Sequence, residues 1–442
     1  MNALPDTPHL APSVYAARRR ALLERIGDGI AVVPTAPQRL RNRDSYYPYR
    51  PDSYFHYLSG FPEPEALVVL VGGAAPRSLL FCREKDEARE TWEGFRYGPD
   101  AACASFGFDE ACAFSEIDAR LPELFSGVET LWLPFGTYRE WETRVFALID
   151  GLRATSRAGT RAPTRVADLC VHLDDMRRVK DTSEIALMRK AAAIASAGHV
   201  RAMRACRVGM AEYALEAELD YEFRRLGANG HAYPPIVAGG ANACVLHYDE
   251  NRAPLAEGTL VLIDAGCEFE NYAADITRTF PVGGRFTPAQ RDVYEIVLAA
   301  QAAAFSAIAP GASFDAYHEA ALRVLVQGLV DLKVLSGAVD GLIESEAYKP
   351  YYMHRTGHWL GLDVHDAGEY VSKARESAVL APGMTLTVEP GLYFRPGCAA
   401  PEAFHGTGVR IEDDVLVTET GAEVYTSAPK TVAEIESLVG RQ

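Results

Sequence analysis

The order of apolar and polar positions divides the first part of the chain into short strands and a helix. Apolar runs of strand length, separated by Gly and Pro turns, occur at Ile30 to Val33, Ala66 to Val71, Leu79 to Phe81 and Thr130 to Leu133. Residues 12–25 have a helical pattern instead. The polar stretch 156–163, with its Gly and Pro, is expected to be a surface connection. These features predict a small N-terminal α/β domain over residues 1–178.

Beyond residue 178 the pattern becomes helical. Asp181 followed by Glu184 fits a capping box, and the apolar spacing after it predicts a long helix to about Cys206. A second helix is expected over residues 211–226. The segment Thr287-Pro288-Ala289-Gln290 offers an N-cap and a helix-starting proline for a third helix, and Ser313 opens a fourth. A second domain is therefore expected over residues 179–442.

Strand-like runs between these helices carry acids. The run TLVLIDAG places Asp264 near its end, and MTLTVEPG repeats that design with Glu389. Each is followed by another strand candidate with an acid, Asp275 in YAADITRTF and Glu412 in GVRIEDDVLV. The repeated design indicates two related halves. We expect an α/β (α+β) fold in which the second domain has two pseudo-symmetric halves.

These four acids indicate a metal site. One strand-end acid usually caps a turn or meets an arginine, but four ionised carboxylates at one buried place need about four compensating positive charges. Arg278 and Arg410 are the nearby basic residues in these runs, which is too few. Two divalent cations would balance the charge, and carboxylates with one imidazole favour Mn²⁺, Co²⁺, Fe²⁺ or Zn²⁺. The acids therefore predict a binuclear metal centre.

A histidine cluster lies between the two acidic pairs. His354, His358 and His365 fall within a glycine-containing segment, and His247 stands in VLHYDEN. A lone histidine is more often a satisfied core residue than a ligand, and composition alone leaves the two interpretations of this cluster equally open. We expect the imidazole ligand to come from it.

Such a centre favours hydrolysis. Two neighbouring metals deprotonate a bridging water and polarise a carbonyl, a nearby carboxylate moves the proton, and His or Arg side chains stabilise developing charge. Because no basic cradle for phosphate is evident, amide hydrolysis is favoured over phosphoester hydrolysis.

Composition excludes other classes. The 442 residues include 44 Lys and Arg against 60 Asp and Glu, a net charge of −16, which disfavours nucleic acid as a partner. The short runs Arg18 to Arg20 and Arg39 to Arg43 are interpreted as solvated. Eight cysteines without a CxxC pair indicate a reducing compartment. With no targeting pattern at the N-terminus and no long apolar run, we expect a soluble cytoplasmic protein without a membrane partner.

Several motifs together resemble a known family. VLHYDEN, LVLIDAG, YAADITRTFPV, MHRTGHWLGLDVHD, LTVEPGLY and GVRIEDDVLVTETG look like the bacterial aminopeptidase P branch of the pita-bread metallopeptidases. The segments DSYYPYRPDSYFHYLSGFPEPEALVVL and ETWEGFRYG are similar to that family's N-terminal domain. The resemblance implies a C-terminal pita-bread domain that releases the first residue from peptides with proline second. An Xaa-Pro amide lacks an N–H and has a fixed φ, which handicaps general peptidases.

The resemblance also implies roles for particular residues. The implied ligands of two divalent ions, most readily Mn²⁺ with Zn²⁺ or Co²⁺ as alternatives, are Asp264, Asp275, His358, Glu389 and Glu412. Asp275 and Glu412 would bridge the metals, and Glu389 would also handle the proton of a bridging hydroxide. The residues implied to surround the scissile carbonyl and the proline are His247, His354, His365 and Arg410, with Tyr393 nearby.

Three positions concern the oligomer and the substrate channel. In the family the N-terminal domain builds a dimer of dimers, so a homodimer or homotetramer is expected. Asp44 and Trp92 match positions that a neighbouring subunit lends to the active site, although they can equally be an ordinary surface Asp and a core Trp. Arg355 stands where the family usually has Gly. It either narrows the channel or binds a substrate carboxylate, or it points to solvent, which we favour.

The leading hypothesis is an Xaa-Pro aminopeptidase. Prolidase, an Xaa-Pro dipeptidase with the same ligands, is the nearest alternative. Methionine aminopeptidases normally lack so large an N-terminal domain, and creatinase-like amidinohydrolases work without metals. A non-catalytic peptide-binding pita-bread protein would typically have lost metal ligands, whereas all five are present here.

Overall fold

The structure is a computed structural model that describes residues 9–372 and 374–441. Residues 1–8, part of the N-terminal stretch inspected for a targeting pattern, lie outside the described residues. The chain divides into two compact units, residues 10–177 and, with residue 9, residues 178–441. No helix among the described residues is long and apolar enough to cross a membrane. All eight cysteines are free thiols, and five of them are buried.

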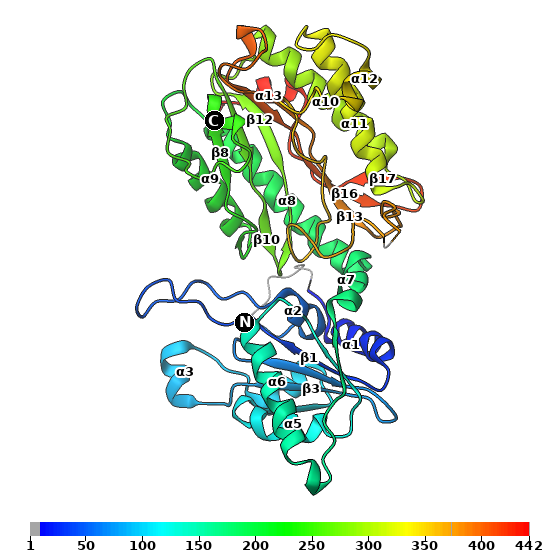
Figure 1. Cartoon of the computed structure of the whole chain (residues 1–442). Coiled ribbons are helices and arrows are strands. Elements are labelled where there is room, and N and C mark those ends of the chain that lie inside the picture. Colours follow the sequence, from blue (N-terminus) through cyan, green and yellow to red (C-terminus); the bar gives the residue numbers. More distant parts are fainter. Residues whose placement is uncertain (1–8, 373, 442) are drawn as a thin grey trace. The chain divides into compact units, whose positions relative to one another are not determined.

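The unit of residues 10–177 alternates strands and helices (Figure 1). Its helices are α1 (Pro12–Ile26), α2 (Ser53–Ser59), α3 (Glu87–Glu93), α4 (Gly98–Phe106), α5 (Ile117–Phe125), α6 (Arg139–Ala154) and α7 (Cys170–Arg178), the last residue of α7 lying beyond the boundary. Its strands are β1 (Ile30–Pro34), β2 (Leu67–Val71), β3 (Arg77–Cys82), β4 (Glu110–Ala113), β5 (Thr130–Leu133) and β6 (Arg165–Asp168). The four apolar runs of the sequence are therefore confirmed as strands.

These strands form a mixed sheet in the order β4-β3-β2-β1-β5-β6. Strand β1 pairs antiparallel with β2 and parallel with β5. One face packs against α5 and α6, whose apolar side chains share a core with alternate strand residues. Helices α1, α2 and α4 contact the strands as well. Because both faces are covered, β1 is buried along its whole length and reads as a continuous apolar run.

The basic run at the start of this unit is not a solvated face. Arg18 and Arg19 are buried, and Arg18 donates to the carbonyl of Tyr57 while Arg19 donates to that of Leu58. The guanidinium of Arg19 also lies over the ring of Phe108, 3.9 Å from its centroid. The solvated interpretation was wrong here because these side chains tie α1 to α2. The second run, residues 39–43, is exposed as expected.

The helices of the second unit begin where the sequence predicted them. They are α8 (Thr182–Ala205), α9 (Glu212–Arg225), α10 (Pro288–Ala307), α11 (Phe314–Asp331), α12 (Val339–Glu344) and α13 (Val432–Leu438). Asp181 and Glu184 form the predicted capping box of α8, and Thr287 and Gln290 form that of α10. Helix α8 packs on α9, and α10 packs on α11, so each half of the unit has its own helix pair (Figure 1).

The strands of this unit form small sheets. Their bounds are β7 (Gly230–His231), β8 (Ile236–Gly239), β9 (Leu260–Asp264), β10 (Cys267–Phe269), β11 (Tyr272–Ala273), β12 (Thr277–Pro281), β13 (Thr385–Val388), β14 (Gly391–Phe394), β15 (Thr407–Arg410), β16 (Asp413–Val417) and β17 (Ala422–Val424). Strand β9 lies between β8 and β12, and β16 lies between β13 and β17. This arrangement repeats the pairing of one acid-bearing segment with another in both halves.

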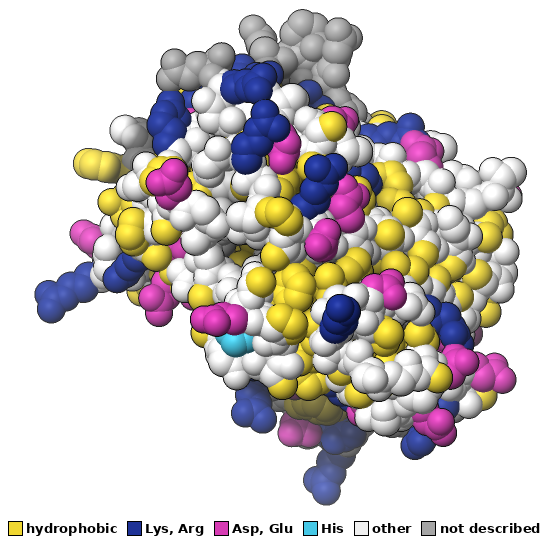
Figure 2. Space-filling view, turned by 90° about the horizontal axis from the view of Figure 1, so that it is seen from above, with side chains coloured by type: hydrophobic (Ala, Val, Ile, Leu, Met, Phe, Trp, Pro, Cys, Tyr) yellow, Lys and Arg dark blue, Asp and Glu magenta, His cyan; other side chains and the backbone are white. Residues whose placement is uncertain are grey.

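The surface carries mixed charge on the face shown in Figure 2. Lys and Arg side chains lie among Asp and Glu side chains there, with apolar side chains between them. The described residues visible in this view form no continuous basic surface.

Candidate metal centre and active site

The four acids lie where strands end or break. Asp264 is the last residue of β9, and Glu389 lies between β13 and β14. Asp275 and Glu412, predicted to be within continuous strands, instead interrupt them, between β11 and β12 and between β15 and β16. That prediction was wrong because the backbone leaves the ladder at each acid. The carboxylates consequently turn toward one another.

Strand register brings the acid-bearing segments of each half together. Asp264 pairs with Thr277, two residues after Asp275, in the antiparallel β9–β12 pair. In the other half Val388, just before Glu389, pairs with Asp413, just after Glu412. The two halves are joined by the amide of Glu412, which donates to the carbonyl of Thr277 at 3.0 Å. All four acids therefore meet where the halves join.

His358 reaches this junction on a loop that runs against β13. The amide of Thr387 donates to the carbonyl of His358 at 2.9 Å, and the amide of Glu389 donates to that of Thr356 at 2.8 Å. Close approach requires glycine at position 357, because a Cβ there would lie 1.9 Å from the carbonyl oxygen of Thr387. The loop thus delivers one imidazole of the predicted cluster to the acids.

These five side chains suit divalent metal. Asp275, His358 and Glu412 each offer a ligand atom, and the three atoms lie within 4.8 Å of one another. The Nε2 of His358 is 3.4 Å from Asp275 Oδ2 and 3.7 Å from Glu389 Oε1. Carboxylate oxygens with one imidazole nitrogen match the preferences of Mn²⁺, Co²⁺ or Zn²⁺. The residues present therefore fit a metal-binding centre.

The electrostatics lead to the same conclusion. Burial raises the pKa of Glu389 to about 7, although His358 and Arg410 oppose the shift. Burial likewise raises the pKa of Asp264 and of Glu412 above their ordinary values. Burial would also raise the pKa of Asp275, but a hydrogen bond from His358 holds it below its usual value. An acid cluster with so little positive charge around it binds either protons or cations.

Tyr233 is a site residue that sequence reasoning missed. Its hydroxyl lies 2.7 Å from Oδ1 of Asp264 and 2.5 Å from Oδ1 of Asp275. A phenol has one proton, so it satisfies only one of these oxygens at a time. The residue precedes Pro234 and Pro235 in a segment without strand or helix pattern, and its sequence context gave no signal.

The two arginines of the acidic runs have different roles. Arg410 donates to Asp264 Oδ2 at 2.7 Å and to the hydroxyl of Tyr393 at 2.9 Å. Arg278 points away from the acid cluster and donates to Asp413 at 2.6 Å. Only one of the two arginines therefore pairs directly with one of the four acids, fewer than the sequence alone suggested.

His354 is held as a neutral ring beside the acids. Its Nδ1 lies 2.7 Å from the carbonyl oxygen of Arg355, so Nδ1 is the donor, and its Nε2 lies 2.8 Å from the hydroxyl of Tyr393. Burial lowers the pKa of His354 to about 3. Tyr393 itself is fully buried. It thus links Arg410 to His354.

A cavity of about 920 Å³ opens onto the acids. His247 and His365 are exposed on its wall, and the ring of His365 packs edge-on against His358 with centroids 4.2 Å apart. Arg355 also lines the cavity, where it pairs with Asp315. The Arg355 side chain is 57% exposed, in agreement with the solvent-facing alternative, yet it borders the cavity mouth.

Asp44 and Trp92 belong to the other unit. Asp44 is exposed, and Trp92 on α3 is 89% exposed. The alternative of a core tryptophan was therefore wrong. A large apolar side chain exposed to this degree is typical of a contact surface.

Comparison with known proteins places this geometry in a family. The model of metallopeptidase family M24 matches residues 186–419, and that of the aminopeptidase P N-terminal domain matches residues 15–132. The Xaa-Pro aminopeptidase of Escherichia coli strain K12 is 45% identical over 96% of this chain and 97% of its own length. That of Haemophilus influenzae is 43% identical over 91% of each chain.

Solved structures agree with the sequence comparisons. The aminopeptidase PepP of Pseudomonas aeruginosa has a TM-score of 0.96 and 49% identity, with 98% of each chain covered. Zinc-substituted E. coli aminopeptidase P in complex with product has a TM-score of 0.95 and 44% identity, covering 97% of this chain and 98% of that one. The chain belongs to metallopeptidase family M24, with the pita-bread domain as its catalytic part. Its N-terminal unit is that of the aminopeptidase P type.

Proposed function

We propose that the chain is a metal-dependent aminopeptidase that releases the first residue of peptides whose second residue is proline. The observation that carries this proposal is the meeting of Asp275, His358 and Glu412 beside a cavity of about 920 Å³. It occurs in a chain 45% identical to the E. coli Xaa-Pro aminopeptidase over almost its whole length. That identity over both units also favours an aminopeptidase over a prolidase.

The side chains that would hold two divalent metals are Asp264, Asp275, His358, Glu389 and Glu412. Bound metal of this kind supplies a water of lowered pKa and polarises the scissile carbonyl. Glu389 lies at the cavity wall with its pKa raised to about 7 by burial, which suits it to accept a proton and return it to the leaving amine.

The remaining wall would bind the peptide. His247 and His365 are exposed on the cavity and are free to approach the scissile bond. His354, 3.8 Å from Glu389, would meet the substrate as a neutral ring because burial keeps its pKa near 3. Arg410 would orient Asp264 and, through Tyr393, His354. Substrate is thus positioned by rings and held charges.

Finer assignments belong to the same proposal. We infer Mn²⁺ as the working metal, a cytoplasmic location, and a homodimer or homotetramer built by the N-terminal unit. Asp44 and Trp92 would then be contributed to a neighbouring active site, which the exposure of Trp92 supports. Light scattering on the purified protein tests the assembly, and a Trp92→Ala variant is expected to raise KM more than it lowers kcat.

A substrate-length series tests the function. Purified protein is stripped with a chelator, reloaded with Mn²⁺, Co²⁺ or Zn²⁺, and assayed on peptides from an Xaa-Pro dipeptide to a nonapeptide. Release of the first residue from tripeptides and longer peptides is expected, and only in the presence of metal. Activity restricted to the dipeptide would make the chain a prolidase, and activity that survives chelation would overturn the metal mechanism.

A further inference from the structure

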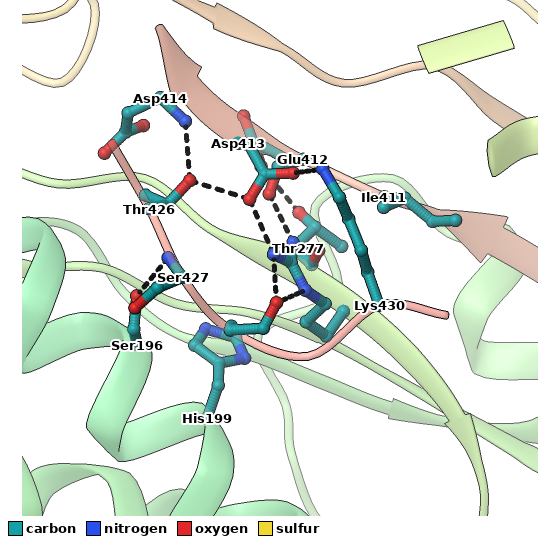
Figure 3. A network of polar contacts seen from close by, with 12 residues as sticks. Ser196, His199, Thr277, Ile411, Glu412, Asp413, Asp414, Thr426, Ser427 and Lys430 are labelled. Carbon is teal, nitrogen blue, oxygen red and sulfur yellow. Dashed lines mark hydrogen bonds and ion pairs between the residues drawn. The ribbon is translucent and has the colours of Figure 1, made fainter. Parts of the chain in front are cut away.

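A buried ionic cluster lies behind the acids, on the side away from the cavity (Figure 3). Its centre is Asp413, which follows Glu412 and has a 1% exposed side chain. The donors to its carboxylate are Arg278 Nη2 at 2.6 Å, Lys430 Nζ at 2.6 Å, Thr426 Oγ1 at 2.7 Å and Gln301 Nε2 at 3.0 Å. Four donors on one buried carboxylate hold it rigidly.

Arg278 extends this cluster to the segments that carry the acids. Its Nη1 donates to the carbonyl of Thr277 at 2.9 Å and to that of Glu412 at 2.5 Å. The hydroxyl of Thr277 in turn donates to Glu412 Oε2 at 2.6 Å. One guanidinium therefore fixes the backbone on both sides of the junction between Asp275 and Glu412.

Gln301 extends it to the remaining acid. From α10, its Nε2 lies 3.2 Å from the carbonyl oxygen of Val388 and 3.2 Å from that of Ile411. These residues immediately precede Glu389 and Glu412. Its Oε1 accepts from Lys430 Nζ at 3.0 Å. The lysine thus orients the amide that contacts both acid-bearing segments.

We propose that Asp413, Arg278 and Lys430 are positioning residues that set the spacing between Glu389, Glu412 and Asp275 and so the affinity of this site for metal. The inference rests on the metal site of the proposed function. Groups that orient metal-binding side chains change metal affinity by about 10–100-fold when they are removed. A purely stabilising cluster would have no reason to contact the backbone at three of the ligand-bearing segments.

Lys430→Met is the most informative variant. The Lys430 side chain is 27% exposed, so its loss leaves the buried Arg278–Asp413 pair intact and the fold is expected to survive. Arg189→Met is the matched control, because it removes an ion pair with Glu423 on β17, which is paired with β16 but does not reach the cluster. Asp413→Asn is a second variant that removes the central charge while keeping its shape.

Metal binding is measured by equilibrium dialysis with Mn²⁺ alone, and geometry by the visible absorption of the Co²⁺-loaded protein. We expect the Mn²⁺ dissociation constant of Lys430→Met to rise by about tenfold or more. Its Co²⁺ spectrum should change, and kcat should fall while KM stays within about twofold of wild type. Lys430→Arg is expected to restore most of the affinity, and Arg189→Met should bind metal as wild type does.

Wild-type Mn²⁺ affinity and an unchanged Co²⁺ spectrum in Lys430→Met would overturn the proposal, as would an equal loss of affinity in Arg189→Met. If Asp413→Asn does not fold, the lysine variants decide alone. Failure of the proposed function is a separate result, because wild-type protein that binds Mn²⁺ but does not cleave Xaa-Pro peptides would refute the activity and leave the affinity comparison valid.

Discussion

The hydroxyl of Tyr393 lies between two site residues, 2.8 Å from Nε2 of His354 and 2.9 Å from Nη1 of Arg410. The same guanidinium binds Asp264 at 2.7 Å. A carboxylate of the metal centre is therefore connected, through an arginine and a tyrosine, to a ring on the cavity wall. This connection fixes both the tautomer and the orientation of His354.

Tyr393→Phe tests this connection. The substitution keeps the ring but removes the donor to His354 and leaves one Arg410 nitrogen without its acceptor. Loss of such a buried contact costs about 1–2 kcal/mol, so we expect kcat/KM on an Xaa-Pro tripeptide to fall by about tenfold. Metal content should stay at the wild-type level. Unchanged kinetics would show that the tyrosine has no orienting effect.

Asp275→Asn tests the metal centre. One charged ligand is removed from the group formed with His358 and Glu412, so we expect loss of tightly bound metal and turnover at background level. The control is Asp340→Asn, since Asp340 is an exposed acid paired with Arg323 on the surface. Metal analysis after gel filtration and peptide assays check both variants. Near wild-type turnover in Asp275→Asn would exclude this residue as a ligand.

Regular features of the fold were predictable because they depend on neighbours in sequence. The capping boxes at Asp181 and Thr287 located two helix starts, and buried apolar runs located the strands of the N-terminal sheet. The breaks at Asp275 and Glu412 were not predictable, since apolar residues continue on both sides of each acid.

The surroundings of the acids were less accessible to sequence reasoning. Tyr233, Gln301 and Lys430 are separated from the acids they affect by long stretches of chain, and each is a residue type common on surfaces. Their roles follow from how the two halves pack together. Arg278 looked like a partner of the metal-site acids in sequence, but its side chain points to Asp413.

Arg355→Gly tests the cavity mouth. Arg355 pairs with Asp315, and both side chains are substantially exposed, at 57% and 40%. Such pairs contribute little to stability, so we expect the free energy of unfolding to change by no more than about 0.5 kcal/mol. Because Asp315 already neutralises the guanidinium, KM for tripeptides should change by less than about threefold. An increase in KM confined to short peptides with a free carboxylate would show instead that Arg355 binds that carboxylate.

His56 makes the N-terminal unit sensitive to acid. Burial, with Arg50, Arg18 and Arg177 nearby, lowers its pKa from 6.5 to about 3. The unfolded chain therefore takes up a proton below pH 6.5 that the folded unit excludes. Its contribution to the free energy of unfolding is lost as pH falls from about 6.5 toward 3, at up to about 1.4 kcal/mol per pH unit.

The His56→Gln variant isolates this contribution. We expect its unfolding free energy, measured by urea titration of the full chain at several pH values, to fall less steeply with acid than that of wild type. The comparison uses slopes, so a constant loss of stability in the variant does not affect it. Parallel slopes would mean that His56 is protonated in the folded unit.

The most direct test of the proposed function compares two peptides on one metal-loaded preparation. The values of kcat/KM for Arg-Pro-Pro and Arg-Ala-Ala are measured with Mn²⁺ at saturating metal. A site shaped for proline should favour Arg-Pro-Pro by at least about tenfold, and the chelated protein should cleave neither peptide. Equal values for the two peptides would contradict the assignment of Xaa-Pro specificity.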